Sequence, residues 1–173
     1  AMAKLPGDVR SFCRWAGLPI PAPSLVKILE EVYQPELQVE DADGSVLFSS
    51  ERAPLTPEEY APLRALVLKS AQCLDQLYAA IPDPEAPLGP ERATFYGRCP
   101  NTARAMFDHV NNCTGYYIAG LGAECDILPG CCATRLGALA AAEALPGFLD
   151  MSPHQAEDGE LWTPRKLLRR FLW

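Results

Sequence analysis

The strongest structural signal in the sequence lies between Thr56 and Ile81. Thr56 and Glu59 have the spacing of a capping box, in which a hydroxyl and a carboxylate satisfy the free backbone amides at a helix start. A proline follows the threonine, and this residue suits the first helical position. Apolar side chains then recur at helical spacing up to Ile81, while Pro62 predicts a kink or a regular helix that starts only there. We expect residues 62–81 to form a long central helix.

Shorter segments with helical character lie on both sides of this helix. The spacing of apolar residues, together with cap and stop residues, predicts helices at about 8–16, 24–33, 101–110, 133–145 and 163–173. Residues 36–49 differ, because apolar and polar residues alternate around an Asp-Gly pair, as in a β-hairpin. The sequence therefore predicts a mainly α fold: an irregular bundle of about five to seven helices around the long central helix, with one small β-hairpin at about 36–49.

A proline-rich connector at 82–90 divides the sequence. It contains four prolines and a glycine, a composition that favours extended chain over helix or strand. An N-terminal helical and hairpin half precedes it, and a C-terminal half with five of the seven cysteines follows it. Each half has fewer than about 100 residues, so we expect residues 1–173 to form a single globular domain with 82–90 as a surface loop.

The distribution of charge restricts the class of partner. The formal net charge is -7, and the last ten residues hold four basic side chains and no acidic one, which leaves -11 on the other 163 residues. An acidic surface repels phosphate backbones, so the composition disfavours nucleic-acid binding. Every uninterrupted apolar stretch is shorter than the roughly 20 residues of a membrane-spanning helix, and we expect no transmembrane segment.

The cysteines favour an intracellular protein, cytoplasmic or nuclear, with reduced thiols. Their number is odd, whereas secreted disulfide frameworks usually have an even number in a shorter chain. Cys13 and Cys73 lie on apolar faces of predicted helices, where a thiol packs as a small hydrophobic group. The opposing observation is Asn112-Cys113-Thr114, which is an N-glycosylation acceptor sequence if the protein is exported.

A zinc-stabilised interaction module is one alternative. His109 and Cys113 are four residues apart, on one face of a predicted helix, and zinc prefers imidazole and thiolate ligands. The remaining spacings resemble no zinc knuckle, because no Cys-x2-Cys pair occurs. The candidate ligands are Cys99, His109, Cys113, Cys125, Cys131 and Cys132. The leading expectation is that the protein binds no cofactor.

A cysteine-dependent hydrolase or protease is the enzymatic alternative. Cys113 supplies a thiol nucleophile, and either histidine of the chain, His109 or His154, could serve as its base. His154 and Asp158 follow Cys113 in the order nucleophile, base and orienting acid. The flanking residues match no catalytic signature.

The leading prediction is a non-enzymatic protein–protein interaction domain, adaptor or regulatory, because no catalytic or cofactor motif rises above chance. We expect another protein to bind at the proline-rich loop or at the C-terminal helix, whose apolar residues alternate with basic ones. The candidate contact residues are Arg165, Lys166, Leu168, Arg169, Arg170 and Phe171. Two alternatives stay open for this helix: peripheral contact with an anionic membrane, or coverage of the domain's own core while its basic side chains offset the acidic body.

Overall fold

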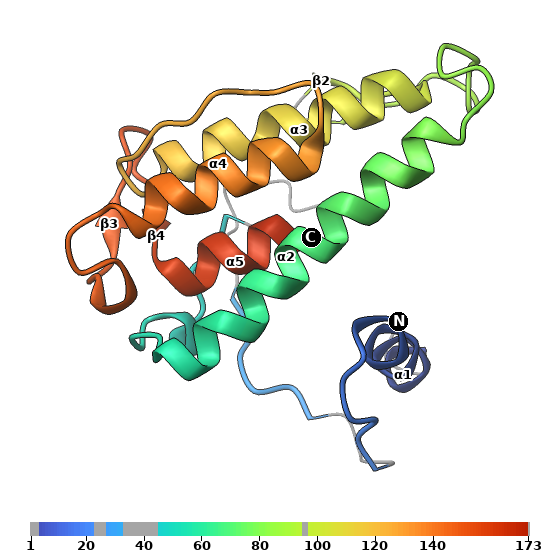
Figure 1. Cartoon of the computed structure of the whole chain (residues 1–173). Coiled ribbons are helices and arrows are strands. Elements are labelled where there is room, and N and C mark those ends of the chain that lie inside the picture. Colours follow the sequence, from blue (N-terminus) through green and yellow to red (C-terminus); the bar gives the residue numbers. More distant parts are fainter. Residues whose placement is uncertain (1–3, 23–26, 33–44, 95–96, 173) are drawn as a thin grey trace. The chain divides into compact units, whose positions relative to one another are not determined.

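The mainly helical prediction is confirmed by the computed structural model, which describes residues 4–22, 27–32, 45–94 and 97–172 (Figure 1). The helices in these ranges are α1 (Leu5–Ala16), α2 (Pro57–Ala79), α3 (Ala103–Ala119), α4 (Cys131–Glu143) and α5 (Pro164–Leu172), with short 3-10 helices η1 (Ser49–Glu51) and η2 (Phe148–Asp150). Two antiparallel pairs of two-residue strands complete them: β1 (Ala93–Thr94) with β2 (Gly97–Arg98), and β3 (His154–Gln155) with β4 (Leu161–Trp162). No described helix has both the length and the apolar character needed to cross a membrane.

The chain separates into two compact units, residues 1–33 and residues 34–173. In the first unit, α1 begins three residues before the predicted start, with a proline in its first turn, and ends at Gly17 in the left-handed conformation, where φ is 78°. The helix predicted at 24–33 is wrong for residues 27–32, which have no regular structure. Its other residues, 24–26 and 33, lie outside the described ranges. The apolar side chains at Ile28, Leu29 and Val32 are exposed, and a short helix without packing contacts is marginal in water.

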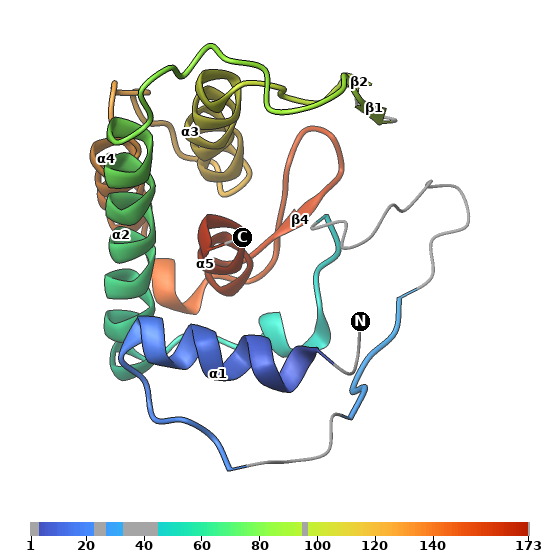
Figure 2. The same cartoon turned by 90° about the vertical axis from the view of Figure 1, so that its right-hand side faces the viewer.

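The second unit is built around α2, as the sequence predicts. The capping box forms: the Thr56 hydroxyl accepts a hydrogen bond from the Glu59 amide, and the Glu59 carboxylate accepts one from the Thr56 amide. Pro62 lies inside the helix. Helix α4 packs against α2 and α3, and α5 packs against the same two helices, as Figure 2 shows. The core between them contains fully buried side chains such as Val67, Ile118 and Leu139.

The small β-structure lies outside the segment predicted for it. Most of the hairpin expected at 36–49 falls in 33–44, outside the described residues, while residues 45–48 are not a strand and Ser49 begins η1. The described strand pairs lie at 93–98 and 154–162. Two-residue strands are too short to show the alternation of apolar and polar residues on which a strand prediction depends.

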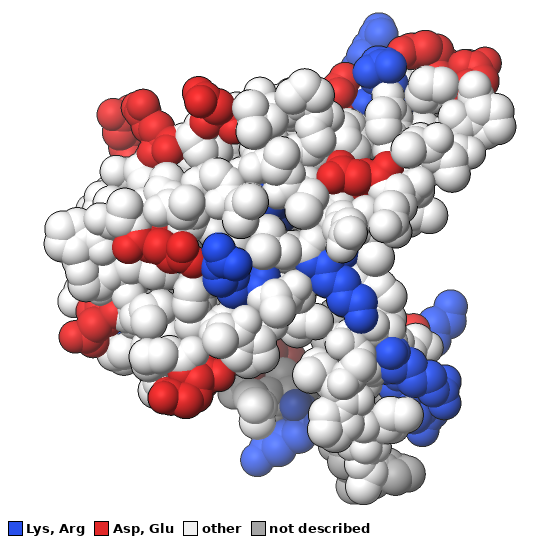
Figure 3. Space-filling model, viewed as in Figure 1, with Lys and Arg blue, Asp and Glu red and all other residues white. Residues whose placement is uncertain are grey.

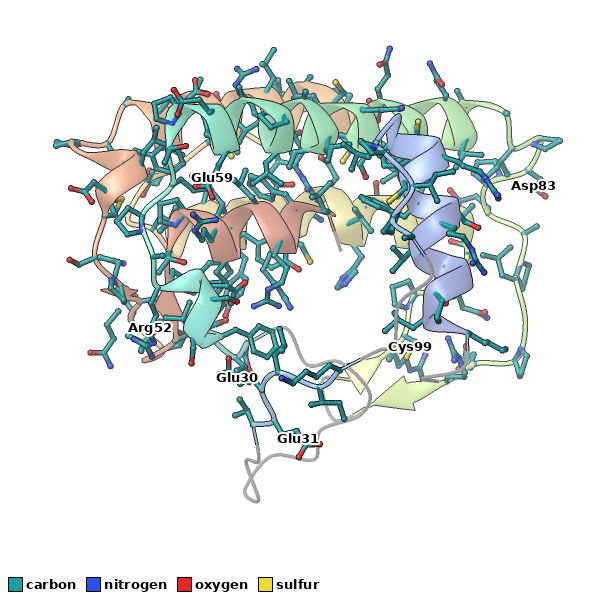
Figure 4. All side chains as sticks on the ribbon, turned by 90° about the horizontal axis from the view of Figure 1, so that it is seen from below. Glu30, Glu31, Arg52, Glu59, Asp83 and Cys99 are labelled. Carbon is teal, nitrogen blue, oxygen red and sulfur yellow. The ribbon has the colours of Figure 1, made fainter. Side chains whose placement is uncertain are left out.

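The proline-rich connector follows α2 without helix or strand, contains a turn at residues 84–85, and is fixed to the start of α3. The Leu88 amide donates to the Asn101 carbonyl at 2.9 Å, and the Arg104 amide donates to the Pro84 carbonyl at 2.9 Å. Arg104 also forms an ion pair with Glu85, whose oxygen lies 2.5 Å from its Nε. These contacts hold the loop at the end of α2 where Asp83 lies, opposite the end that holds Glu59 (Figure 4).

Candidate functional site

The apolar face of α5 is buried in the core of the second unit. Leu168 is 1% exposed and Phe171 is 3% exposed, and the Phe171 ring lies 6.2 Å from the ring of Tyr117 on α3. Of the alternatives that the sequence leaves open for this helix, coverage of the domain's own core agrees with this burial.

The arginines of α5 also contact the chain itself. Arg165 places Nη2 at 2.6 Å from the Glu59 carboxylate and donates to the carbonyls of Ala53 and Pro54. Arg169 pairs with Glu51. Arg170 donates from Nη2 to the Tyr117 hydroxyl at 3.0 Å. Arg165 and Arg169 therefore connect α5 to the segment that leads into α2, and Arg170 connects α5 to α3.

Lys166 is fully buried and contacts β4. Its Nζ lies 2.6 Å from the Glu160 carboxylate, donates to the carbonyls of Ser45 and Leu161, and lies 4.6 Å from the centre of the Trp162 ring. Burial lowers the pKa of Lys166, against the effect of Glu160. In this structure the side chains of the six predicted α5 residues make contacts within the chain. Binding of a partner through them stays a prediction.

A recess of about 450 Å³ lies between η1, α2 and α5. Its apolar lining comes from Leu63, Leu168 and Leu172. Its charged lining residues are Glu51, Arg165 and Arg169, and all three are already in ion pairs. It has space for an apolar side chain but presents no thiol or imidazole. On the face shown in Figure 3, basic and acidic side chains are scattered among uncharged ones.

The predicted triad residues have different partners. The His154 Nδ1 donates to the Gly120 carbonyl at 2.9 Å. Asp158 accepts hydrogen bonds from the Tyr116 hydroxyl at 2.8 Å and from the Glu160 amide at 2.9 Å. In the described part of the chain, no hydrogen bond joins His154 to Cys113 or to Asp158. The structure therefore does not bring these residues together as nucleophile, base and orienting acid.

Cys113 instead faces His109, one helical turn earlier on α3. Its Sγ lies 3.7 Å from the His109 Nε2, and the His109 side chain is exposed while Cys113 is half-buried. The neighbouring Tyr117 is buried, and burial, followed by the interaction with Cys113, raises the pKa of Tyr117. The spacing of four residues predicts this histidine beside the thiol, either as a zinc ligand or as a base for Cys113.

The six predicted zinc ligands are distributed over separate places. Among the described residues, no three histidine, cysteine or acidic side chains are close enough to hold a metal ion, and all seven cysteines are free thiols. Cys99 lies beside β2 near the proline-rich loop (Figure 4). Cys131, at the start of α4, is 1% exposed, and burial raises the pKa of both Cys131 and Cys125. Both therefore hold their protons at neutral pH, as expected of thiols that fill packing space.

Helix α1 presents an apolar surface that sequence reasoning assigned to no site. Its outward apolar side chains, with two that follow Gly17, are between 36% and 49% exposed: Leu5, Val9, Phe12, Trp15, Leu18 and Ile20. The Phe12 and Trp15 rings lie 5.6 Å apart. The helical spacing of Val9 and Phe12 is visible in the sequence. We call this set the α1 apolar face.

Comparison with known proteins found no match: no family model, no curated protein and no solved structure is significantly similar to this chain.

Proposed function

We propose that this chain is a protein-interaction domain that places α1 in an apolar groove of another protein, one with acidic side chains at the groove's rim. The observation that supports the proposal is the α1 apolar face, which holds two aromatic rings at a partly exposed surface. Helix-in-groove recognition uses apolar side chains three and four positions apart, and Leu5, Val9, Phe12 and Ala16 have that spacing.

The length of α1 supports a role in binding. The helix has 12 residues, and isolated helices of that length are marginal in water. Burial of Phe12 and Trp15 in a groove would contribute both binding energy and helix stability, because large aromatic side chains dominate the energetics of most interfaces.

Charge complementarity determines the kind of groove. Lys4, Arg10 and Arg14 are basic, whereas Asp8 is the only acidic side chain between residues 4 and 20. A groove with carboxylates at its rim would attract this helix and orient it. The α5 residues support such a role less well, since their charges are already paired within the chain.

The test compares the full chain with two variants that each add one negative charge to α1. Phe12→Asp disrupts the α1 apolar face, and Ser11→Asp is the matched control at the adjacent polar position. A protein captured from cells by the wild type is purified, and its affinity for the wild type and for both variants is measured by calorimetry. We expect Phe12→Asp to weaken binding by about 30-fold or more, the effect of losing one hot-spot side chain.

Three results would contradict the proposal. One is equal affinity of the wild type and Phe12→Asp for the purified protein. Another is binding of the wild type to phosphatidylserine vesicles, lost in Phe12→Asp, without binding to any protein. The third is a dimer, detected by sedimentation, that Phe12→Asp dissociates, since the occupant of the groove would then be a second copy of this chain.

A further inference from the structure

Cys113 lies in a cluster of titratable groups that take no part in the proposed interaction. Cys113 and His109 lie on α3 with 3.7 Å between Sγ and Nε2. Tyr117, one turn further along α3, interacts with the same thiol and accepts a hydrogen bond from Arg170 of α5. Arg135 of α4 also interacts electrostatically with Cys113. Helix α3 thus places an imidazole beside the half-buried thiol, and a guanidinium group of α4 interacts with the same thiol.

Arg135 is an unusual member of this cluster. It is 4% exposed, and its described contacts are with neutral groups: Nε donates to the Thr114 hydroxyl at 2.8 Å, Nη1 donates to the Phe171 carbonyl, and the guanidinium lies 4.4 Å from the Phe171 ring. No carboxylate among the described residues lies within ion-pair distance. A buried charge without a counter-charge is costly, so Arg135 favours negative charge on a group beside it.

We propose that Cys113 is a site of thiol–disulfide exchange with low-molecular-weight disulfides, and that His109 accepts the proton of the attacking thiol. The Cys113 sulfur attacks one sulfur of the disulfide, so that a new sulfur–sulfur bond forms as the disulfide bond breaks. The thiol proton passes to the His109 Nε2 and then to the departing thiolate, which leaves as a thiol. Cys113 is oxidised to a mixed disulfide and the small disulfide is reduced.

The cluster has the components that this exchange needs. A thiolate is the attacking species, and a base within reach of the thiol promotes its formation. Arg135 adds a positive charge to this region, and its electrostatic interactions are with Cys131, Tyr117 and Cys113. The exposed His109 side chain lies at the surface, and the half-buried Cys113 lies next to it. Among the described residues, no hydrogen bond joins another cysteine to an imidazole, and the Nδ1 of the second histidine, His154, donates to the Gly120 carbonyl.

The experiment treats the full chain with oxidised glutathione at neutral pH and measures adduct formation at each cysteine by peptide mass spectrometry. Cys73 is the internal reference, since it is half-buried, like Cys113, and has no imidazole beside it. We expect Cys113 to react about tenfold faster than Cys73, and His109→Gln to slow Cys113 by about tenfold while leaving Cys73 unchanged. His154→Gln is the matched control and should leave both rates unchanged.

Two outcomes would overturn the proposal: a Cys113 rate no higher than that of Cys73, or a Cys113 rate that His109→Gln does not lower. Loss of folding cannot imitate the expected result, because unfolding exposes every thiol and raises both rates.

Discussion

Among single residues, Gly120 is required because its position has no space for a side chain, and not because of its backbone conformation. Its φ of -58° is accessible to any residue. A Cβ at this position would lie 2.5 Å from Cε2 of Trp162, whose side chain is 1% exposed and packs in the core. The indole cannot shift easily, because Lys166 and the rings of Tyr116 and Tyr117 lie against it.

Gly120→Ala should therefore lower the free energy of unfolding by about 1–3 kcal/mol, the usual cost of overpacking a core. Gly137→Ala is the matched control, since this glycine lies within α4 and a Cβ there would have no neighbour within 4 Å. The control should raise stability by up to about 1 kcal/mol, because alanine favours a helix interior more than glycine does. Urea unfolding of both variants checks the prediction, and equal effects would contradict it.

At the scale of the element, the sequence predicted where most helices form but not what their faces contact. The capping box and the apolar spacing located α2, and local signals located parts of α1, α3, α4 and α5. The partners of these helices come from distant positions. The amides of Cys131 and Cys132 at the start of α4 are capped by Asp75 of α2, at 2.7 and 2.9 Å. No local pattern connects residues 56 positions apart, so such contacts were not predictable.

The same limitation applied to the candidate sites. The alternation of basic and apolar residues in α5 is equally consistent with a surface that binds a partner and with a helix that pairs with the chain's own carboxylates. The pairing of His109 with Cys113 was predictable, because a separation of four residues is local on a helix. Chain order suggested His154 as the base, but order contains no information about distance.

Burial of α5 predicts a large effect of truncating Leu168. Leu168→Ala should lower the free energy of unfolding by about 2–5 kcal/mol, as for other buried leucines. Leu136→Ala makes the same chemical change on α4, where the side chain is 47% exposed, and should alter stability by less than about 0.5 kcal/mol. Urea unfolding measures both. A Leu168→Ala effect as small as that of the control would mean that α5 does not pack into the core in solution.

At the scale of the whole molecule, carboxylates connect elements of the 34–173 unit in spite of the chain's net negative charge. Glu143 of α4 accepts hydrogen bonds from the Tyr60 hydroxyl and from Arg64 Nε, both at 2.7 Å and both from α2. Glu59 connects α2 to Arg165 of α5. The stability of this unit therefore depends on carboxyl groups that stay ionised.

The pKa values of these carboxyl groups give the direction of the pH dependence. The amide of Thr56, and then Arg165, lower the pKa of Glu59. Partial burial alone would raise the pKa of Glu143, but hydrogen bonds from Tyr60 and Arg64 outweigh burial and lower it. The ordinary pKa of both groups, which applies to the unfolded chain, is 4.5. Each carboxyl group therefore contributes fully to stability above that pH, and its contribution is lost as the pH falls through its lower pKa in the folded protein.

The urea midpoint should therefore fall between about pH 6 and about pH 3, and Glu143→Gln should make this fall smaller. Glu58→Gln is the matched control, since it removes an exposed carboxyl of α2 for which the described structure contains no ion pair. This control should leave the slope of the midpoint against pH unchanged. A wild-type midpoint that is constant across this range, or an equal slope in Glu143→Gln, would show that the contacts between α2 and α4 do not depend on the charge of Glu143.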